Sequence, residues 1–177
     1  HEYCRENDIL FLTTPFDTNS VNLLMDYVPA YKIASYTLSH HPFLKHVANT
    51  GKPVIMSTGA HSLDEVREAV SVLRTAGVSD LVLLQCVASY PTPLDSINVR
   101  AIERLRKEFG THVGLSDHTT DPTIAPAATV ALGGVVVEKH FTLDRSMEGP
   151  DHSFAPEPDE LDKMVTAIRR TESALGR

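Results

Sequence analysis

The apolar positions of the chain gather in short continuous runs, and the stretches between the runs repeat apolar residues at a helical period. Apolar runs without strict alternation are typical of strands that are covered on both faces, as in parallel sheets. Successive runs begin roughly 20 to 32 residues apart, which is about the length of one strand–helix unit. The pattern predicts six strands, at residues 8–14, 30–35, 53–58, 80–87, 112–117 and 135–141.

The stretches between the runs carry the start and stop signals of helices. In the clearest of them Ser62 can cap the first turn, Glu65 completes a capping box, and Gly77 supplies a stop. Pro126 lies inside a weaker stretch and predicts either a bend or a helix start at that residue. The predicted helices lie within residues 62–77, 98–110, 122–134 and 157–176.

Strands that alternate with helices predict an α/β fold with a parallel sheet, in one of two architectures. One is an open doubly wound sheet, and the other is a (β/α)8 barrel of the TIM type. The first predicted strand lacks the glycine-rich loop that follows it in dinucleotide-binding open sheets, which favours the barrel. A barrel needs about 250 residues, so the 177 residues here correspond to about six βα units, with the first two units missing. We therefore expect residues 1–177 to form a single partial TIM-barrel domain.

Composition and charge narrow the classes of partner. The net charge of −7 argues against a nucleic-acid binder, because phosphate backbones attract a surplus of Lys and Arg, but it leaves small anionic ligands open. The sequence has no run of 18 apolar residues that would span a membrane, and it shows no secretion signal. The unlike surroundings of Cys4 and Cys86 favour reduced thiols over a disulfide framework. We expect a cytoplasmic protein with neither nucleic acid nor membrane as a partner.

Polar side chains end every predicted strand, at the carboxyl ends where both architectures place function. Because side chains alternate between the faces of a strand, Ser116 and His118 share one face of the fifth predicted strand. Glu138 and His140 share one face of the sixth by the same rule. The intervening residues, which point the other way, are Asp117 and Lys139.

Two imidazoles converge if both of these faces turn toward the mouth of a barrel. Two imidazoles with a nearby carboxylate suit Mn²⁺, Fe²⁺, Co²⁺ or Zn²⁺, with positions left open for water or substrate. The alternative is a pair of hydrogen-bonded histidines that only brace loops. The residues alone leave both interpretations open.

An unusual lysine, Lys32, lies inside the second predicted strand. A lysine directed into a barrel is costly unless an anion pairs with it. Hydroxyl groups at neighbouring strand ends would complete a cradle for a phosphate or a carboxylate. The alternative is a lysine whose stem is buried and whose charged head reaches solvent. The residues that carry these hydroxyls are Thr14, Ser35, Ser57 and Ser116.

Seven motifs cover nearly the whole chain: FLTTPFD, YKIAS, GKPVIMSTGA, YPTP, GLSDHT, ALGGVVVEKHFTLDR and GPDHSFAPEPDEL. In this order they resemble the barrel of the N-acetylneuraminate (sialic acid) synthase family, and GLSDH and EKHFT followed by GPDH are the most specific. The resemblance implies a TIM-barrel transferase. It would condense phosphoenolpyruvate with an N-acyl amino sugar, such as N-acetylmannosamine, to a nine-carbon 2-keto acid and phosphate.

The resemblance also implies roles for the residues at matching motif positions. Phosphoenolpyruvate would be held by Thr14, Lys32, Ser35, Ser57 and Ser116. The sugar would be faced by Tyr90 and Asp151. The ligands of a divalent metal, Mn²⁺ with Mg²⁺ or Co²⁺ as alternatives, would be His118 and His140. Glu138 would hold water on the metal or the sugar, and the catalytic set would be Glu138, His140 and Lys32.

From the resemblance we expect residues 1–177 to lack counterparts of the family's first two βα units and of its small C-terminal antifreeze-like domain. The resemblance implies a homodimer for the full-length parent and weak or no activity for this piece in isolation. Two other functions stay open. A metal-dependent aldolase or hydrolase on the same barrel would turn over without phosphoenolpyruvate, whereas a non-catalytic barrel fragment would only bind or assemble.

Overall fold

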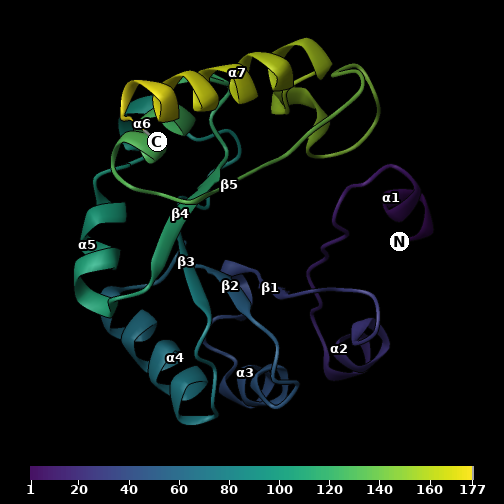
Figure 1. The fold of residues 1–177 in the computed structure, drawn as a ribbon, viewed down its shortest axis with the longest axis vertical. Helices are drawn as coiled ribbons and strands as arrows, with labels where there is room; N and C mark the ends of the chain where they lie inside the picture. Colours follow the sequence, from purple (N-terminus) through teal and green to yellow (C-terminus); the bar gives the residue numbers. More distant parts are fainter. Residues whose placement is uncertain (177) are drawn as a thin grey trace. The chain divides into compact units, whose positions relative to one another are not determined.

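The computed structural model describes residues 1–176 and has a parallel α/β fold (Figure 1). Its strands hydrogen-bond in chain order, from β1 to β5, and the pairs β1–β2 and β4–β5 are parallel. Because a doubly wound sheet changes its strand order at a switch point, chain order favours the barrel type over the open sheet. The strands are β1 (Tyr31–Ile33), β2 (Val54–Ser57), β3 (Leu81–Cys86), β4 (His112–Asp117) and β5 (Val136–Lys139).

The first of the six predicted strands is wrong. Residues 8–14 form neither a helix nor a strand, so the described part of the chain has five strands in place of six. Ile9 and Leu10, in the apolar part of this run, are 63% and 79% exposed. A strand exists only where its backbone groups pair with a neighbouring strand, whereas an apolar run reports only on side chains.

Contacts within the chain divide it into two compact units, and the first covers His1–Leu83. In this unit α2 packs against α3, and α3 packs against α4. The predicted capping box is present at the start of α4, where Ser62 and Glu65 each accept a hydrogen bond from the other's backbone N–H. The helical elements are α1 (Glu2–Glu6), α2 (Thr18–Leu24), the 3-10 turn η1 (Ser35–Thr37), α3 (His41–Ala48) and α4 (Leu63–Thr75).

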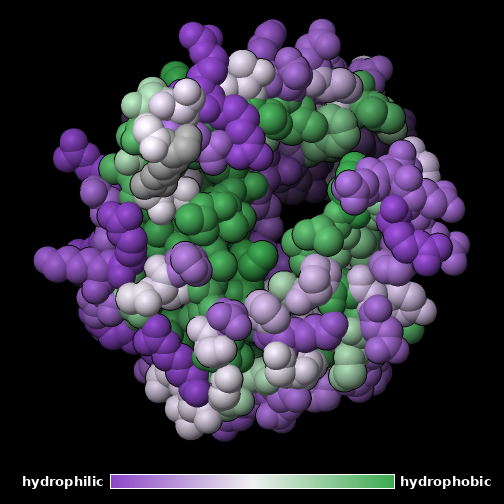
Figure 2. Space-filling view, viewed as in Figure 1, coloured by the Kyte–Doolittle hydropathy of each residue, from purple (hydrophilic) through white to green (hydrophobic). Residues whose placement is uncertain are grey.

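The second unit begins at Leu84; in it α5 and α6 contact β4, and α6 contacts α7. α5 buries Ile102, Leu105 and Phe109 and turns its charged residues to solvent, where Figure 2 shows a hydrophilic outer surface. Gly110 ends this helix in the left-handed conformation that glycine adopts readily. The helical elements are the 3-10 turn η2 (Leu94–Ser96), α5 (Ala101–Phe109), α6 (Ile124–Ala131), the 3-10 turn η3 (His152–Phe154) and α7 (Pro158–Ala174).

Pro126 does not begin its helix, because α6 starts two residues earlier, at Ile124. The proline therefore lies in the first turn, where backbone N–H groups have no intrahelical acceptor and the missing N–H costs no hydrogen bond. None of the helices within residues 1–176 is both long enough and apolar enough to cross a bilayer.

A glycine sets the distance of closest approach between β4 and β5. A Cβ atom added to Gly114 would overlap the carbonyl oxygen of Val136 and would lie 2.9 Å from Cδ2 of Leu84. Gly114 is the register partner of Val136, so the overlap falls on the pairing of the two strands. The absence of a side chain at this position lets the two strands pair in their observed register.

We expect Gly114→Ala to destabilise the fold by about 2 kcal/mol or more, because overpacking against backbone forces the strands apart. The free energy of unfolding from urea titration, followed by circular dichroism, measures the change. Gly51→Ala is the control: its added methyl meets nothing within 4 Å, so only the left-handed backbone contributes, at about 1 kcal/mol. Equal losses in the two variants would contradict the steric account of Gly114.

Candidate active site

Lys32 is a buried lysine in the first unit, where it lies on β1 with 7% of its surface exposed. Its Nζ donates a hydrogen bond to Ser57 Oγ at 2.8 Å, from the end of β2, and another to the Ile33 carbonyl at 3.2 Å. Ser35 is also buried, and its Oγ accepts from the backbone N–H of Gly59 at 3.0 Å. The lysine head is therefore inside the protein with a hydroxyl beside it, and the alternative of a head that reaches solvent is wrong.

The third hydroxyl expected in the first unit, that of Thr14, lies in the coil before α2 and is half-buried. The first unit thus places the Ser57 hydroxyl directly beside the Lys32 ammonium and holds the buried Ser35 hydroxyl against the Gly59 N–H. An ammonium and hydroxyl donors held in place are suited to a carboxylate or a phosphate.

The register of β4 and β5 organises the polar residues of the second unit. Ser116 pairs with Glu138, and the Ser116 hydroxyl donates to Glu138 Oε1 at 2.6 Å. The next rung pairs Asp117 with Lys139, whose side chains meet at 2.7 Å between Nζ and Oδ2. Since side chains alternate along a strand, these two contacts lie on opposite faces of the strand pair, as the sequence predicts.

The two imidazoles follow directly after these strands and lie side by side. The ring centroids of His118 and His140 are 5.3 Å apart, with an angle of 56° between their planes. His118 is buried, whereas the side chain of His140 keeps about a third of its surface exposed. The predicted convergence of the two histidines is therefore present in the structure.

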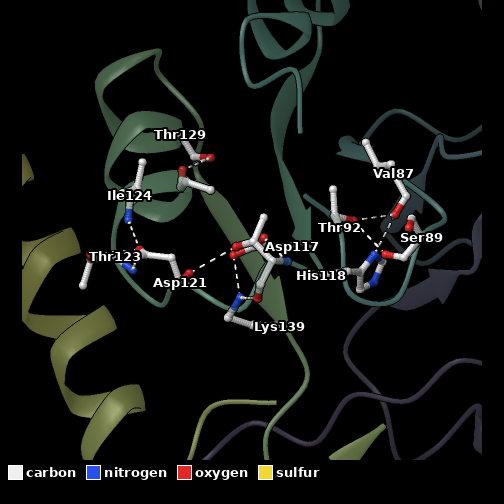
Figure 3. Close-up of polar contacts among 12 residues, drawn as sticks. Val87, Ser89, Thr92, Asp117, His118, Asp121, Thr123, Ile124, Thr129 and Lys139 are labelled. Carbon is white, nitrogen blue, oxygen red and sulfur yellow. Dashed lines mark hydrogen bonds and ion pairs between the residues drawn. The ribbon is translucent and has the colours of Figure 1, made fainter. Parts of the chain in front are cut away.

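Hydrogen bonding fixes which ring nitrogen of His118 can bind a ligand. His118 Nδ1 lies 2.9 Å from the carbonyl oxygen of Val87 (Figure 3). Because a carbonyl oxygen can only accept, Nδ1 carries the proton and Nε2 keeps its lone pair. His140 Nδ1 lies 3.6 Å from Asp151 Oδ2, within ion-pair distance. Both rings thus present their Nδ1 atoms to an oxygen of the protein, which is the usual arrangement of metal-binding histidines.

Aromatic rings enclose the two imidazoles. The Tyr90 ring lies over that of His118, with 4.1 Å between centroids, and meets the His140 ring edge-on at 5.8 Å. Phe154, which is buried, packs against His140 at 5.2 Å. Ring contacts of this kind restrict the rotation of the imidazoles. They also place the exposed Tyr90 where it can meet a ligand of the histidines.

Burial lowers the pKa of His118, and the neighbouring His140 lowers it further, against the opposing effects of the Val87 carbonyl and of nearby carboxylates. His118 is therefore neutral at pH 7, in the form that binds a metal ion. No group of three or more His, Cys, Asp or Glu residues within residues 1–176 is arranged to hold a metal. Two adjacent imidazoles suit a metal whose other positions are filled by water or substrate.

The whole chain, residues 1–177, matches the model of the NeuB family. The chain belongs to the NeuB family. One relative, the N,N′-diacetyllegionaminic acid synthase of Campylobacter jejuni, is 42% identical over 177 residues, which are 98% of this chain and 53% of the relative. The chain spans about half the length of the curated relatives that it matches.

Solved structures of NeuB relatives share the fold of this chain. The spore coat polysaccharide biosynthesis protein SpsE of Bacillus subtilis superposes with a TM-score of 0.96 at 44% identity, over 99% of this chain and 49% of that one. The N-acetylneuraminic acid (sialic acid) synthetase of Leptospira borgpetersenii serovar Hardjo-bovis, solved in complex with citrate, gives a TM-score of 0.93 at 37% identity. That match covers 99% of this chain and 61% of that one. The resemblance drawn from the motifs is confirmed at the level of the family.

Three groups that contact the histidines of this NeuB-family site were not predicted from the sequence: the Val87 carbonyl, Thr92 and Phe154. The Val87 carbonyl carries no signal, because any residue supplies one. Thr92 lies in the YPTP motif, and its backbone N–H donates to the His118 carbonyl at 2.8 Å. Phe154 lies in the GPDHSF motif, where the available signal was an aromatic residue directly after two polar ones. The structure buries this side chain.

Asp121 holds the chain between His118 and α6. Its Oδ1 accepts hydrogen bonds from the backbone N–H groups of Thr123 and Ile124, at 2.8 and 2.7 Å. Its backbone carbonyl accepts from the Thr119 hydroxyl at 3.1 Å. Burial acts to raise the pKa of the Asp121 carboxyl, but these N–H donors outweigh it and hold the pKa below its ordinary value of 3.8.

We expect Asp121→Ala to lower the free energy of unfolding at pH 7 by about 1 kcal/mol, the usual loss for a helix N-terminal cap. Because the folded-state pKa is depressed, the contribution of Asp121 is fully present above pH 3.8 and is lost as the pH falls through the folded value. Urea titrations at several pH values should therefore bring wild type and variant progressively closer as the pH falls below 3.8 and through the folded-state pKa. A difference that stays constant down to strongly acidic pH would contradict the assignment.

Proposed function

We propose that the protein carrying this chain condenses phosphoenolpyruvate with an N-acyl amino sugar, N-acetylmannosamine or a similar one, to a nine-carbon 2-keto acid and phosphate. The observation that supports this most directly is the pair of adjacent imidazoles with both Nδ1 atoms directed at protein oxygens. Membership of a family whose relatives are synthases of sugar acids supports it independently. The protein is then a carbon–carbon bond-forming transferase.

Lys32, Ser35 and Ser57 would bind the anionic groups of phosphoenolpyruvate, together with Thr14 and Ser116. The buried Lys32 ammonium is a strong donor toward carboxylate or phosphate oxygens, because it is shielded from bulk water. Donors that are already in place need no reorganisation when charge develops on the departing phosphate. This arrangement supports a substrate with two acidic groups over a neutral one.

His118 and His140 would hold a divalent metal, with Mn²⁺ the expected ion. When bound, such an ion polarises the aldehyde oxygen of the open-chain sugar as a Lewis acid. The contribution of the chain is to keep His118 neutral through burial and to direct both Nε2 atoms away from Val87 and Asp151. Tyr90 and the exposed Asp151 would face the sugar.

The proposed condensation forms one carbon–carbon bond and breaks the bond between C2 and the phosphate oxygen. C3 of phosphoenolpyruvate forms a bond to the aldehyde carbon, whose oxygen takes up a proton and becomes a hydroxyl. A water molecule adds to C2, and the C2–O bond to phosphate breaks, which leaves the 2-keto group and inorganic phosphate. Glu138 would hold the water or a sugar hydroxyl, because the Ser116 hydroxyl donates to its Oε1 and fixes the carboxylate.

Phosphate release by the intact protein tests the proposed reaction. We expect release that requires phosphoenolpyruvate, Mn²⁺ and one member of a panel of N-acyl hexosamines. Lys32→Met should lower kcat/KM by about ten- to a hundredfold, the effect of losing a charge-assisted hydrogen bond worth about 1.5–3 kcal/mol. Lys45→Met, on the outer helix α3, is the matched control and should leave kcat/KM unchanged.

Two outcomes of this assay would reject the proposal. Absence of phosphate release with every sugar would exclude the condensation. Turnover of a sugar acid without phosphoenolpyruvate would favour a metal-dependent aldolase or hydrolase that uses the same two histidines.

His118→Ala should weaken Mn²⁺ binding by more than about 100-fold, since a directly bound ligand matters more than the outer-shell partners that cost 10–100-fold. Binding is measured from the electron paramagnetic resonance signal of free Mn²⁺, and circular dichroism checks that the fold is retained. His46→Ala is the control, because His46 contacts Asn22 in the first unit. Unchanged affinity in the His118 variant would remove His118 from the ligand set.

A further inference from the structure

The two imidazoles lie one residue beyond the strands that carry them. β4 ends at Asp117 and β5 ends at Lys139, so neither His118 nor His140 belongs to the hydrogen-bonded ladder of the sheet. The ladder fixes the backbone only up to the last paired residues. Some other contact must therefore hold the backbone that places the two rings at 5.3 Å.

A buried ion pair occupies the last rung of the two strands. Lys139 Nζ lies 2.7 Å from Asp117 Oδ2, and the exposed fractions of the two side chains are 3% and 0%. Both charges have been withdrawn from water, and their attraction does not in general outweigh the cost of desolvation. Stability alone is thus a weak reason for an ion pair at this position.

The same pair also binds the peptide groups that follow His118 (Figure 3). Asp117 Oδ1 accepts from the Thr119 backbone N–H at 2.9 Å, and Lys139 Nζ donates to the Thr119 carbonyl at 2.7 Å. Both backbone polar groups of the buried Thr119 are therefore satisfied by the pair. On its other side the His118 carbonyl accepts from the Thr92 N–H. The backbone of His118 is held by side chains at the point where strand pairing ends.

We propose that Asp117 and Lys139 are positioning residues for the two imidazoles. The pair locks the backbone after β4 and thereby keeps His118 Nδ1 against the Val87 carbonyl and the two rings 5.3 Å apart. Lys139 also stands between Glu138 and His140 in the chain, so the same contact fixes both sides of the histidine pair. The inference deepens the proposed function and rests on it for the identity of the bound metal, but the geometry that it concerns can be measured without metal.

Single substitutions would leave one buried charge without its partner and would test stability rather than position. The double variant Asp117→Asn/Lys139→Met removes both charges at nearly constant volume. The asparagine amide oxygen can still accept from Thr119 N–H, whereas a methionine cannot donate to the Thr119 carbonyl. In the intact protein we expect this variant to unfold in urea near the wild-type midpoint and to bind Mn²⁺ about tenfold more weakly, the usual effect of an outer-shell partner.

A second neutral variant, Asp117→Asn/Lys139→Gln, restores a donor toward the Thr119 carbonyl. Its Mn²⁺ affinity should lie between those of the first variant and wild type, and it provides the test where the methionine variant does not fold. Arg169→Met/Glu172→Gln removes an exposed ion pair on α7 and should change nothing. Wild-type affinity in a folded variant without the buried pair would show that the pair serves the fold alone and would overturn the proposal.

The tautomer of His118 gives a readout that needs no metal. In ¹⁵N NMR spectra of the metal-free protein, wild-type His118 should show the proton on Nδ1 alone, because Nδ1 donates to Val87. Both double variants should show an increased fraction of the Nε2-protonated form. An unchanged tautomer would overturn the positioning role. If wild type binds no Mn²⁺ while the double variants show the tautomer shift, the proposed function is refuted and the positioning role is still supported.

Discussion

The parallel register of β4 and β5 is the constraint on which the rest of the candidate site depends. In this register Ser116 meets Glu138 and Asp117 meets Lys139. A slip of one residue would reverse the face of every side chain on one strand relative to the other. His118 and His140 would then lie on opposite faces, and the Ser116–Glu138 hydrogen bond and the buried ion pair would be lost together. The chemistry of the second unit is therefore a consequence of strand pairing.

Residues far apart in the sequence support this register and the loop that contacts His118. Gly114 allows the close approach of β5, because any side chain there would overlap the Val136 carbonyl. The Thr92 hydroxyl donates to the Ser89 carbonyl at 2.8 Å, which shapes the loop that carries Tyr90. The Thr92 N–H then ties that loop to His118. The position of the imidazoles therefore depends on backbone packing at Gly114 and on the loop contacts of Thr92.

The sequence predicts those parts of the structure that follow from local patterns. The capping box of Ser62 and Glu65 gives the start of α4, and Gly110 gives the end of α5. Alternation along two strands gives the shared face of His118 and His140. These features need no knowledge of distant contacts, so one sequence is sufficient for them.

Other parts depend on partners that a sequence does not reveal. Residues 8–14 have the apolar pattern of a strand but no strand pairing, and α3 begins with a histidine cap, His40, whose Nδ1 accepts from the Phe43 N–H. The acceptor for His118 is the backbone carbonyl of Val87, which has no side-chain signature.

The Asp117–Lys139 contact could not be predicted for a different reason. Alternation shows that both residues point away from the imidazoles, and this makes them look irrelevant to the site. A charged residue on the covered face of a strand end has to be neutralised inside the protein, and the peptide groups beyond the strand are the nearest additional partners. The face that avoids the ligand is therefore the face that can hold the ligand-binding residues in place.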